Sequence, residues 1–156
     1  MNIFLEKFVK EKFKKPGKAL DLGAGEFHDV DGLRNLGWNC RGVDKNIGID
    51  LNFEYLADDG PFNLVFSNYV LHKIKKKKVF WENILNNLKV GGWVFIHTFD
   101  SSDKIGRTDL DEEKMKKILK EKGFENINTK VFDYYDNDPG HNHWHRIIEA
   151  IGQKNN

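Results

Sequence analysis

The sequence predicts a doubly wound α/β fold, with a mostly parallel sheet, helices on both faces and an antiparallel hairpin at the C-terminal end. Two observations carry this prediction. Short apolar segments alternate with segments whose apolar residues recur at helical spacing, and this alternation implies right-handed crossovers between parallel strands. The last two β-rich segments are joined by a turn-rich stretch without a helix, so we expect them to pair antiparallel.

The first half of the chain alternates between helix and strand. Residues 2–14 place apolar side chains on one helical face, and Pro16-Gly17 ends that helix. The apolar segment 18–22 then predicts a buried strand, which is closed by glycine. A short helix is expected at 27–36, followed by Gly37 as its stop signal. Further strands are expected at 40–44, 47–51 and 63–67.

The second half begins with a helix at 75–88, whose apolar residues share one face. The strongly apolar segment 93–99 predicts the next strand. Thr108 followed by Asp111 resembles a capping box, which would open a helix that ends near Lys122. Two β-rich segments, 127–135 and 144–152, complete a seven-stranded sheet.

Composition excludes several classes of protein. The 156 residues suffice for one domain, and 39% apolar and 13% aromatic residues are typical of a folded chain. Cys40 is the single cysteine, which excludes a disulfide framework and a cysteine zinc cluster and fits a cytoplasmic protein. The net charge of +1 argues neither for nor against a polyanionic partner. No apolar run approaches the ~18 residues of a membrane span, and early charges argue against a signal peptide.

A glycine-rich loop, Asp21-Leu-Gly-Ala-Gly25, follows the first strand and opens a helix. Glycines let the backbone approach a ligand closely, and the helix start offers free N–H groups to an anionic group. Asp44 ends the second strand, where a carboxylate can accept both hydroxyls of a ribose. This order predicts a nucleoside-cofactor site, and the alternative is a tight turn near an unrelated surface aspartate.

A dinucleotide fingerprint would carry a third glycine where this chain has His28. Four segments instead resemble the successive motifs of class I S-adenosylmethionine-dependent methyltransferases: KALDLGAGEF (18–27), GVD (42–44), FNLVFSNYVLHKI (62–74) and LKVGGWVFIHTF (88–99). The resemblance covers residues 18 to about 100. It implies a Rossmann-like methyltransferase domain over residues 1–156, with an N-terminal helix in 1–15, a catalytic core in 18–156 and S-adenosylmethionine as cofactor.

The resemblance also assigns residues to the methionine end of the cofactor. Gly23, Ala24 and Gly25 would cradle the methionine portion. Asp21 would hold that loop and face the amino group of the cofactor. Asn68 would lie beside this amino group and the transferred methyl.

Four more residues are assigned to the adenosine end. Asp44 would bind the ribose hydroxyls, and Lys45 would border the adenine. Asp50 and Leu51 would meet the edge and the face of the adenine. Two features depart from the family pattern, because Phe27 replaces the third loop glycine and the segment between the second and fourth strands is short.

The substrate side carries three candidate residues, Tyr69, His72 and His97. Tyr69 belongs to the Ser-Asn-Tyr segment after the fourth strand, which lacks the Asn/Asp-Pro-Pro-aromatic motif of enzymes that methylate exocyclic amines of DNA bases or glutamine side chains. His97 is interpreted as a wall residue or base, or as a hydrogen-bonded core histidine. His72 would line the cleft or cap the following helix.

Two further segments leave alternatives open. His141, His143 and His145 alternate, so they share one side of an extended chain. They would form a polar pocket or base beside Trp144 and Tyr135, bind a metal, or belong to a solvated edge hairpin, and no metal ligand is assigned. The lysines at 75–78 would attract an anionic acceptor or nucleic acid, or form a solvated face.

The sequence therefore predicts a cytoplasmic methyltransferase that acts on an oxygen, nitrogen or carbon nucleophile of a small-molecule acceptor. The absence of an appended recognition domain favours a small acceptor, and no membrane partner is expected. The alternatives are RNA or protein methylation, which the lysine run would serve, and a non-catalytic S-adenosylmethionine-binding scaffold. A nicotinamide oxidoreductase is disfavoured by His28.

Overall fold

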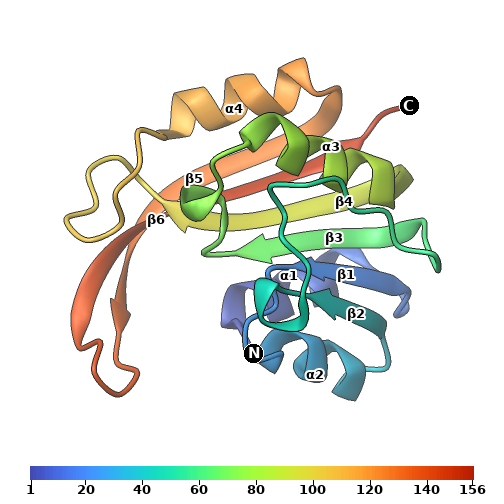
Figure 1. Cartoon of the computed structure of the whole chain (residues 1–156), viewed down its shortest axis with the longest axis horizontal. Coiled ribbons are helices and arrows are strands. Elements are labelled where there is room, and N and C mark those ends of the chain that lie inside the picture. The colour runs from blue at the N-terminus through green and yellow to red at the C-terminus, as the bar shows by residue number, and fades with distance from the viewer.

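A computed structural model describes residues 1–156. Its centre is a six-stranded sheet with the strand order β2-β1-β3-β4-β6-β5 (Figure 1). The strands are β1 (Lys18–Leu22), β2 (Asn39–Val43), β3 (Phe62–Asn68), β4 (Leu88–Phe99), β5 (Phe124–Asp136) and β6 (His143–Lys154). The first four pair in parallel, and β6 is antiparallel to both β4 and β5. The predicted terminal hairpin is confirmed.

Helices cover both faces of the sheet, as the sequence predicts. They are α1 (Ile3–Lys12), α2 (His28–Asn35), α3 (Lys77–Asn87) and α4 (Glu112–Glu121), with two short 3₁₀ helices, η1 (Lys45–Ile47) and η2 (Leu71–Lys73). Helices α3 and α4 pack on one face in a cluster around Phe80, Ile84, Met115 and Leu119. Helices α1 and α2 pack on the other face around Phe8 and Leu33. No helix is long and apolar enough to cross a membrane.

The strand expected at 47–51 is absent, so the prediction of seven strands is wrong. This segment instead forms η1 and an irregular path in which Leu51 is buried. Two buried amides of α3 bind the backbone of the residues that follow this segment. Asn83 accepts from the N–H of Tyr55 at 2.8 Å, and Asn87 accepts from the N–H of Ala57 at 2.9 Å. Their amide nitrogens donate to the carbonyls of Phe53 and Tyr55, so these hydrogen bonds hold residues 53–57 against α3.

The helix expected from Thr108 starts later, at Glu112. Asp111 is the N-cap, because its side chain accepts from the N–H of Lys114 at 2.8 Å. Thr108 accepts only from the N–H of Leu110. The predicted capping box therefore identifies the right region but the wrong capping residue.

The carboxyl ends of the four parallel strands face the same side of the molecule, where the distal part of the β5–β6 hairpin curls past the sheet (Figure 1). The sheet thus ends beside a wall made by its own last two strands. Ligands of doubly wound folds bind at this edge.

Candidate active site

A cavity of about 870 Å³ lies at the carboxyl ends of the strands. This volume is within the range of small-molecule binding sites. The glycine loop and α2 form one wall, the N-terminal residues another, and the β5–β6 hairpin a third. The lining residues are Met1, Asn2, Ile3, Phe4, Asp21, Gly23, Ala24, Gly25, His28, Asp29, Asn68, Tyr69, His72, Lys73, Phe99, Ile105, Tyr134, Asp136, Asp138, Gly140, His141, His143 and His145.

The glycine loop is held to the end of β2 by backbone hydrogen bonds. The N–H groups of Gly23 and Ala24 both donate to the carbonyl of Val43 at 2.9 Å. Gly23 has a φ of +97°, and a Cβ there would lie 2.3 Å from Cγ2 of Val70. Only glycine satisfies both constraints. Gly25, in contrast, lies in open space, where a Cβ would meet nothing within 4 Å.

Phe27 adopts the left-handed conformation that a glycine would supply. Its φ is +66°, and its N–H donates to the carbonyl of Ala24 at 2.8 Å. Its ring packs beside Gly42, where an added Cβ would lie 2.6 Å from Cε1 of Phe27. The loop thus keeps a sharp turn into α2 despite the departure from the family pattern.

Asp21 supplies a buried carboxylate to the cavity. Its side chain is 2% exposed, and Oδ1 has no hydrogen-bond partner. Burial, together with the charges of Asp29 and Asp44, raises the pKa of Asp21 well above its usual value. A cationic ligand group beside this carboxylate would offset both effects. The ammonium group of an amino-acid moiety has the required charge and donors.

Asn68 and Asp29 continue this polar wall. Asn68 Nδ2 donates to Asp29 Oδ2 at 2.9 Å, and the backbone N–H of Asn2 donates to Asp29 Oδ1 at 2.6 Å. Oδ1 of Asn68 is buried without a partner. Besides Asp21, the site therefore has a second acceptor without a partner, Oδ1 of Asn68. It lies beside the hydrogen bonds that join Asp29 to Asn2 and Asn68.

The four residues assigned to the adenosine end lie outside the cavity lining. Asp44 is bonded to the glycine loop, since its carboxylate accepts from the N–H groups of Gly25 and Asn46, both at 2.9 Å. Lys45 begins η1 and is exposed. Asp50 accepts from the backbone and side chain of Asn52, and these hydrogen bonds lower the pKa of Asp50. Leu51 is 5% exposed and belongs to the same core cluster as Phe80 and Ile84 of α3.

His97 is a hydrogen-bonded core histidine. It is fully buried, its Nδ1 lies 3.1 Å from Nδ2 of Asn2, and its Nε2 lies 2.8 Å from Oε2 of Glu149. The amide of Asn2 donates to Nδ1, so Nε2 carries the hydrogen that Glu149 accepts. Burial opposes ionisation of Glu149, but His97 and Lys130 lower the pKa of this carboxyl. His97 thus connects the N-terminal segment to the sheet.

Tyr69 and His72 both line the cavity. Tyr69 has a φ of +61°, and its N–H donates to the carbonyl of His97 at 2.8 Å. Burial raises the pKa of Tyr69, so its hydroxyl keeps its proton. Burial, followed by the charges of Lys73 and Lys77, lowers the pKa of His72 to about 4. The imidazole of His72 is therefore neutral at neutral pH, and its Nδ1 has no partner.

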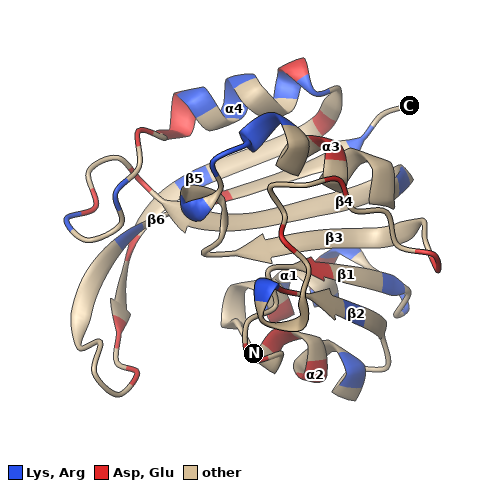
Figure 2. Cartoon of the chain, in the orientation of Figure 1, with Lys and Arg blue, Asp and Glu red and all other residues tan.

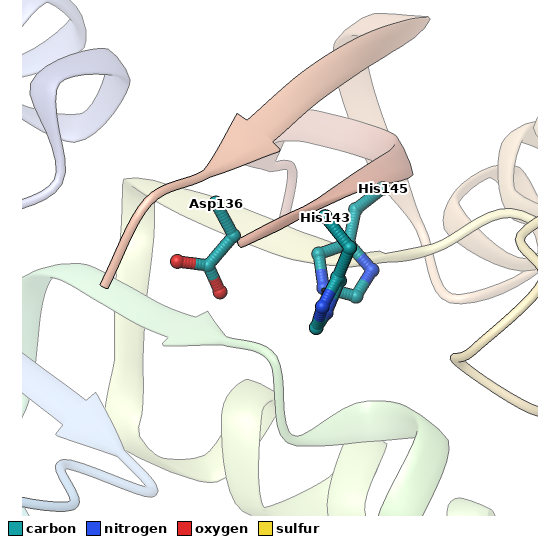
Figure 3. Close-up of side chains that lie close together, drawn as sticks. All are labelled: Asp136, His143 and His145. Atoms are coloured by element: carbon teal, nitrogen blue, oxygen red, sulfur yellow. Dashed lines mark hydrogen bonds between the residues drawn. The ribbon is translucent and has the colours of Figure 1, made fainter. Parts of the chain in front are cut away.

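The hairpin contributes a group of imidazoles and carboxylates to the opposite wall (Figure 3). Nε2 of His143 lies 2.9 Å from Nε2 of His145, and Nδ1 of His141 lies 2.9 Å from Oδ2 of Asp136. The three histidines thus lie at the cavity. The expected pocket beside Trp144 and Tyr135 is absent, because these side chains alternate onto the other face of the hairpin and are 65% and 41% exposed.

The lysine run precedes and opens α3 and forms the blue segment there in Figure 2. Lys77 Nζ donates to the carbonyls of Leu71 and Ile74, and the ammonium of Lys76 lies 5.1 Å from the ring centroid of Phe53. Lys78 also lies 3.7 Å from Oε1 of Glu82, so three of the four lysines have intramolecular side-chain contacts. These contacts account for cations at a helix start, where the macrodipole opposes them.

Over residues 3–145 the chain matches a family model described as a methyltransferase domain. The chain belongs to this family. This membership confirms the predictions of a class I S-adenosylmethionine-dependent methyltransferase and of S-adenosylmethionine as its methyl donor. A search of curated protein sequences gave no match.

Solved structures of methyltransferases share the fold. A Methanosarcina mazei S-adenosylmethionine-dependent methyltransferase has a TM-score of 0.75 and 13% identity, with 95% of this chain and 97% of that chain covered. The Burkholderia thailandensis 1,6-didemethyltoxoflavin-N1-methyltransferase has a TM-score of 0.72 and 15% identity, with coverage of 96% and 76%. Haemonchus contortus phosphoethanolamine N-methyltransferase 2 has a TM-score of 0.72 and 16% identity, with coverage of 99% and 53%, so this chain spans about half of it.

In this methyltransferase the structure brings together the residues assigned to the methionine end, since Asp21, the glycine loop and Asn68 line one cavity. Sequence reasoning missed Asp29 and Asn2. Asp29 lies in the first turn of α2, where acidic residues are common because they interact favourably with the helix dipole. An aspartate at this position therefore does not by itself indicate a functional site. Asn2 reaches the site only because α1 packs across the sheet, which no local pattern indicates.

Proposed function

We propose that this methyltransferase transfers the methyl group of S-adenosylmethionine to an oxygen, nitrogen or carbon nucleophile of a small-molecule acceptor. The single observation that carries the proposal is the continuity of the cavity. One volume joins the glycine loop and Asp21 to Tyr69, His72 and the hairpin wall. A donor at the loop and an acceptor at the hairpin would therefore share one enclosed space.

The donor's charges match the polar wall. Its ammonium group would bind at Asp21 and the free Oδ1 of Asn68, both of which are buried acceptors without partners. Its methionine backbone would pass over Gly25, where the open space leaves room for a ligand. Asp44 and Lys45 would meet the ribose and the adenine beyond the loop. Each oxygen of Asp44 accepts one backbone N–H and keeps a lone pair for a ribose hydroxyl.

The reaction itself asks little of the protein beyond positioning. The acceptor's lone pair forms a bond to the methyl carbon while the carbon–sulfur bond breaks, and the sulfur leaves as a neutral thioether. Holding donor and acceptor at near-attack distance supplies most of the acceleration in such a displacement. A base is needed only when the acceptor arrives protonated. His72 would be that base, because its neutral imidazole lines the cavity.

Two observations support a small acceptor over RNA or a protein. The Burkholderia neighbour binds 1,6-didemethyltoxoflavin, and a Haemonchus neighbour binds phosphomonomethylethanolamine, both of which are small molecules. The lysine run, which would favour RNA, has three members with side-chain contacts inside the chain. We therefore expect a low affinity for RNA that changes only slightly with salt concentration.

The test is transfer of a labelled methyl group. The protein is incubated with methyl-labelled S-adenosylmethionine and a panel of small amines, phenols and carboxylates, and products are identified by mass spectrometry. His72→Asn is expected to lower kcat most for acceptors that are protonated at the assay pH, and to leave cofactor affinity unchanged. Binding of the cofactor without transfer to any small molecule, RNA or protein would favour the scaffold alternative.

A further inference from the structure

The β5–β6 hairpin places three donor side chains on one face. His143 and His145 lie two residues apart in β6, so their side chains share a face of the strand. Asp136 in β5 pairs directly with His143 across the hairpin. Two imidazoles and one carboxylate therefore project together into the cavity (Figure 3).

These donors lie close enough together to converge on one ion through small rotations of their side chains. A nitrogen or oxygen from each of Asp136, His143 and His145 lies within 4.8 Å of the other two. Nε2 of His143 and Nε2 of His145 are 2.9 Å apart. Two nitrogens at about 2.1 Å from one metal ion lie about 3.0 Å apart at right angles and about 3.4 Å apart at the tetrahedral angle.

Asp103 orients His145 for this role. Its side chain is 1% exposed, and its oxygens accept from the backbone N–H groups of Ile105, Gly106 and Arg146. Oδ2 of Asp103 also lies 3.2 Å from Nδ1 of His145. An acceptor carboxylate at this position keeps the hydrogen on Nδ1, so the lone pair of Nε2 faces His143. Carboxylates hold metal-binding histidines in this way.

Asp136 is oriented by a similar arrangement. Its Oδ2 lies 2.9 Å from Nδ1 of His141, and its Oδ1 accepts from the N–H of Asp138 at 3.0 Å. Each oxygen keeps a further lone pair. His141 thus positions the carboxylate, as Asp103 positions the imidazole of His145.

We propose that Asp136, His143 and His145 bind one divalent first-row transition-metal ion at the hairpin wall of the cavity. The donor set of two imidazoles and one carboxylate suits zinc, cobalt, nickel or ferrous iron better than magnesium or calcium, which prefer oxygen ligands. Three protein ligands leave coordination positions open toward the cavity. The role toward an acceptor rests on the proposed methyl transfer: the ion would anchor an acceptor that carries a nitrogen or oxygen lone pair.

Cobalt binding tests the site directly. Protein without a histidine tag is stripped with a chelator, dialysed and titrated with Co²⁺, and binding is followed by visible absorption. We expect saturation at one ion per chain and displacement by Zn²⁺. His143→Asn and His145→Asn should each weaken binding at least tenfold. Asp103→Asn should weaken it about 10- to 100-fold, as other outer-shell partners do.

A matched control is His28→Asn, because His28 is an exposed histidine that pairs only with Glu26. Its cobalt affinity should equal that of the wild type, and circular dichroism shows that each variant is folded. Absence of saturable cobalt absorption in the folded wild type would overturn the proposal, as would equal affinity in the His143 and His145 variants. In that case His143 simply donates a hydrogen bond to His145. Titration of the His143 and His145 variants with S-adenosylmethionine separates this test from that of the proposed function. Because the three proposed ligands lie on the hairpin wall and not at the glycine loop, these variants should keep the cofactor affinity of the wild type.

Discussion

Gly23 is the position where the loop conformation depends most strictly on glycine. Alanine at this position would have a φ of +97° and a Cβ 2.3 Å from Cγ2 of Val70. The left-handed backbone costs about 1–2 kcal/mol for a residue with a Cβ, and overpacking of this kind costs about 1–3 kcal/mol. Gly23→Ala should therefore lower the free energy of unfolding by about 2–5 kcal/mol.

Two comparison variants separate these contributions. Gly48 has a φ of +88°, and a Cβ there would meet nothing within 4 Å, so Gly48→Ala should cost only the backbone part. Val70→Ala in the Gly23→Ala background removes the overlapping methyl groups. The double-mutant cycle should then give a favourable interaction energy of about 1–3 kcal/mol.

Urea unfolding followed by circular dichroism measures all four variants. The reasoning is refuted if Gly23→Ala is no more destabilising than Gly48→Ala. It is also refuted if Val70→Ala gives no coupling in the cycle, since the overlap would then be relieved by movement of the loop.

Three further predictions concern buried polar groups. Folding raises the pKa of Asp21, so the protonated carboxyl stabilises the folded state. This contribution is complete below the unfolded pKa of about 3.9 and is lost as the pH rises through the folded pKa. Asp21→Asn should therefore unfold at higher urea than the wild type at pH 7, and pH-dependent urea midpoints check this. Glu149 has the opposite sign, since its lowered pKa stabilises the fold above the unfolded pKa of about 4.3 and less as the pH falls through the folded pKa. The stability difference between wild type and Glu149→Gln should shrink in acid, and a constant difference would contradict the assigned contacts. Asn87→Ala leaves the buried N–H of Ala57 without its partner and should cost about 1–3 kcal/mol, whereas Asn86→Ala, at an exposed position of the same helix, should change the stability by less than about 0.5 kcal/mol in the same assay.

The parallel core, and the meeting of Asp21, the glycine loop and Asn68 at one edge of the sheet, could be predicted from the sequence because their signals are local. A buried strand, a glycine loop and a helix occur within residues 18–36, and chain order alone brings Asn68 to the same edge. The third loop glycine of the family is a local signal that this chain lacks, and the loop conformation is kept without it. Phe27 supplies the same positive φ, and packing against Gly42 accounts for its side chain.

The features that sequence reasoning missed depend on contacts between distant segments. The segment expected as a strand at 47–51 instead forms η1 and an irregular path in which Leu51 is buried. The residues that follow are held by amides about 30 residues later in the chain, in α3. Asn2 joins the site through α1, and Asp103 reaches His145 across 42 residues. Alternation of the histidines predicted a shared face, but the carboxylates that orient them are set by tertiary packing.

The most direct test of the account is calorimetric titration of the protein with S-adenosylmethionine and its demethylated product. We predict saturable one-to-one binding that Asp21→Asn and Asp44→Ala each weaken by more than about tenfold, or about 1.4 kcal/mol. Asp58→Asn is the control, because Asp58 is an exposed acid paired with Arg41 outside the cavity, and its affinity should match the wild type. Folded wild-type protein that binds neither ligand at millimolar concentration would contradict the central claim that this cavity holds the methyl donor.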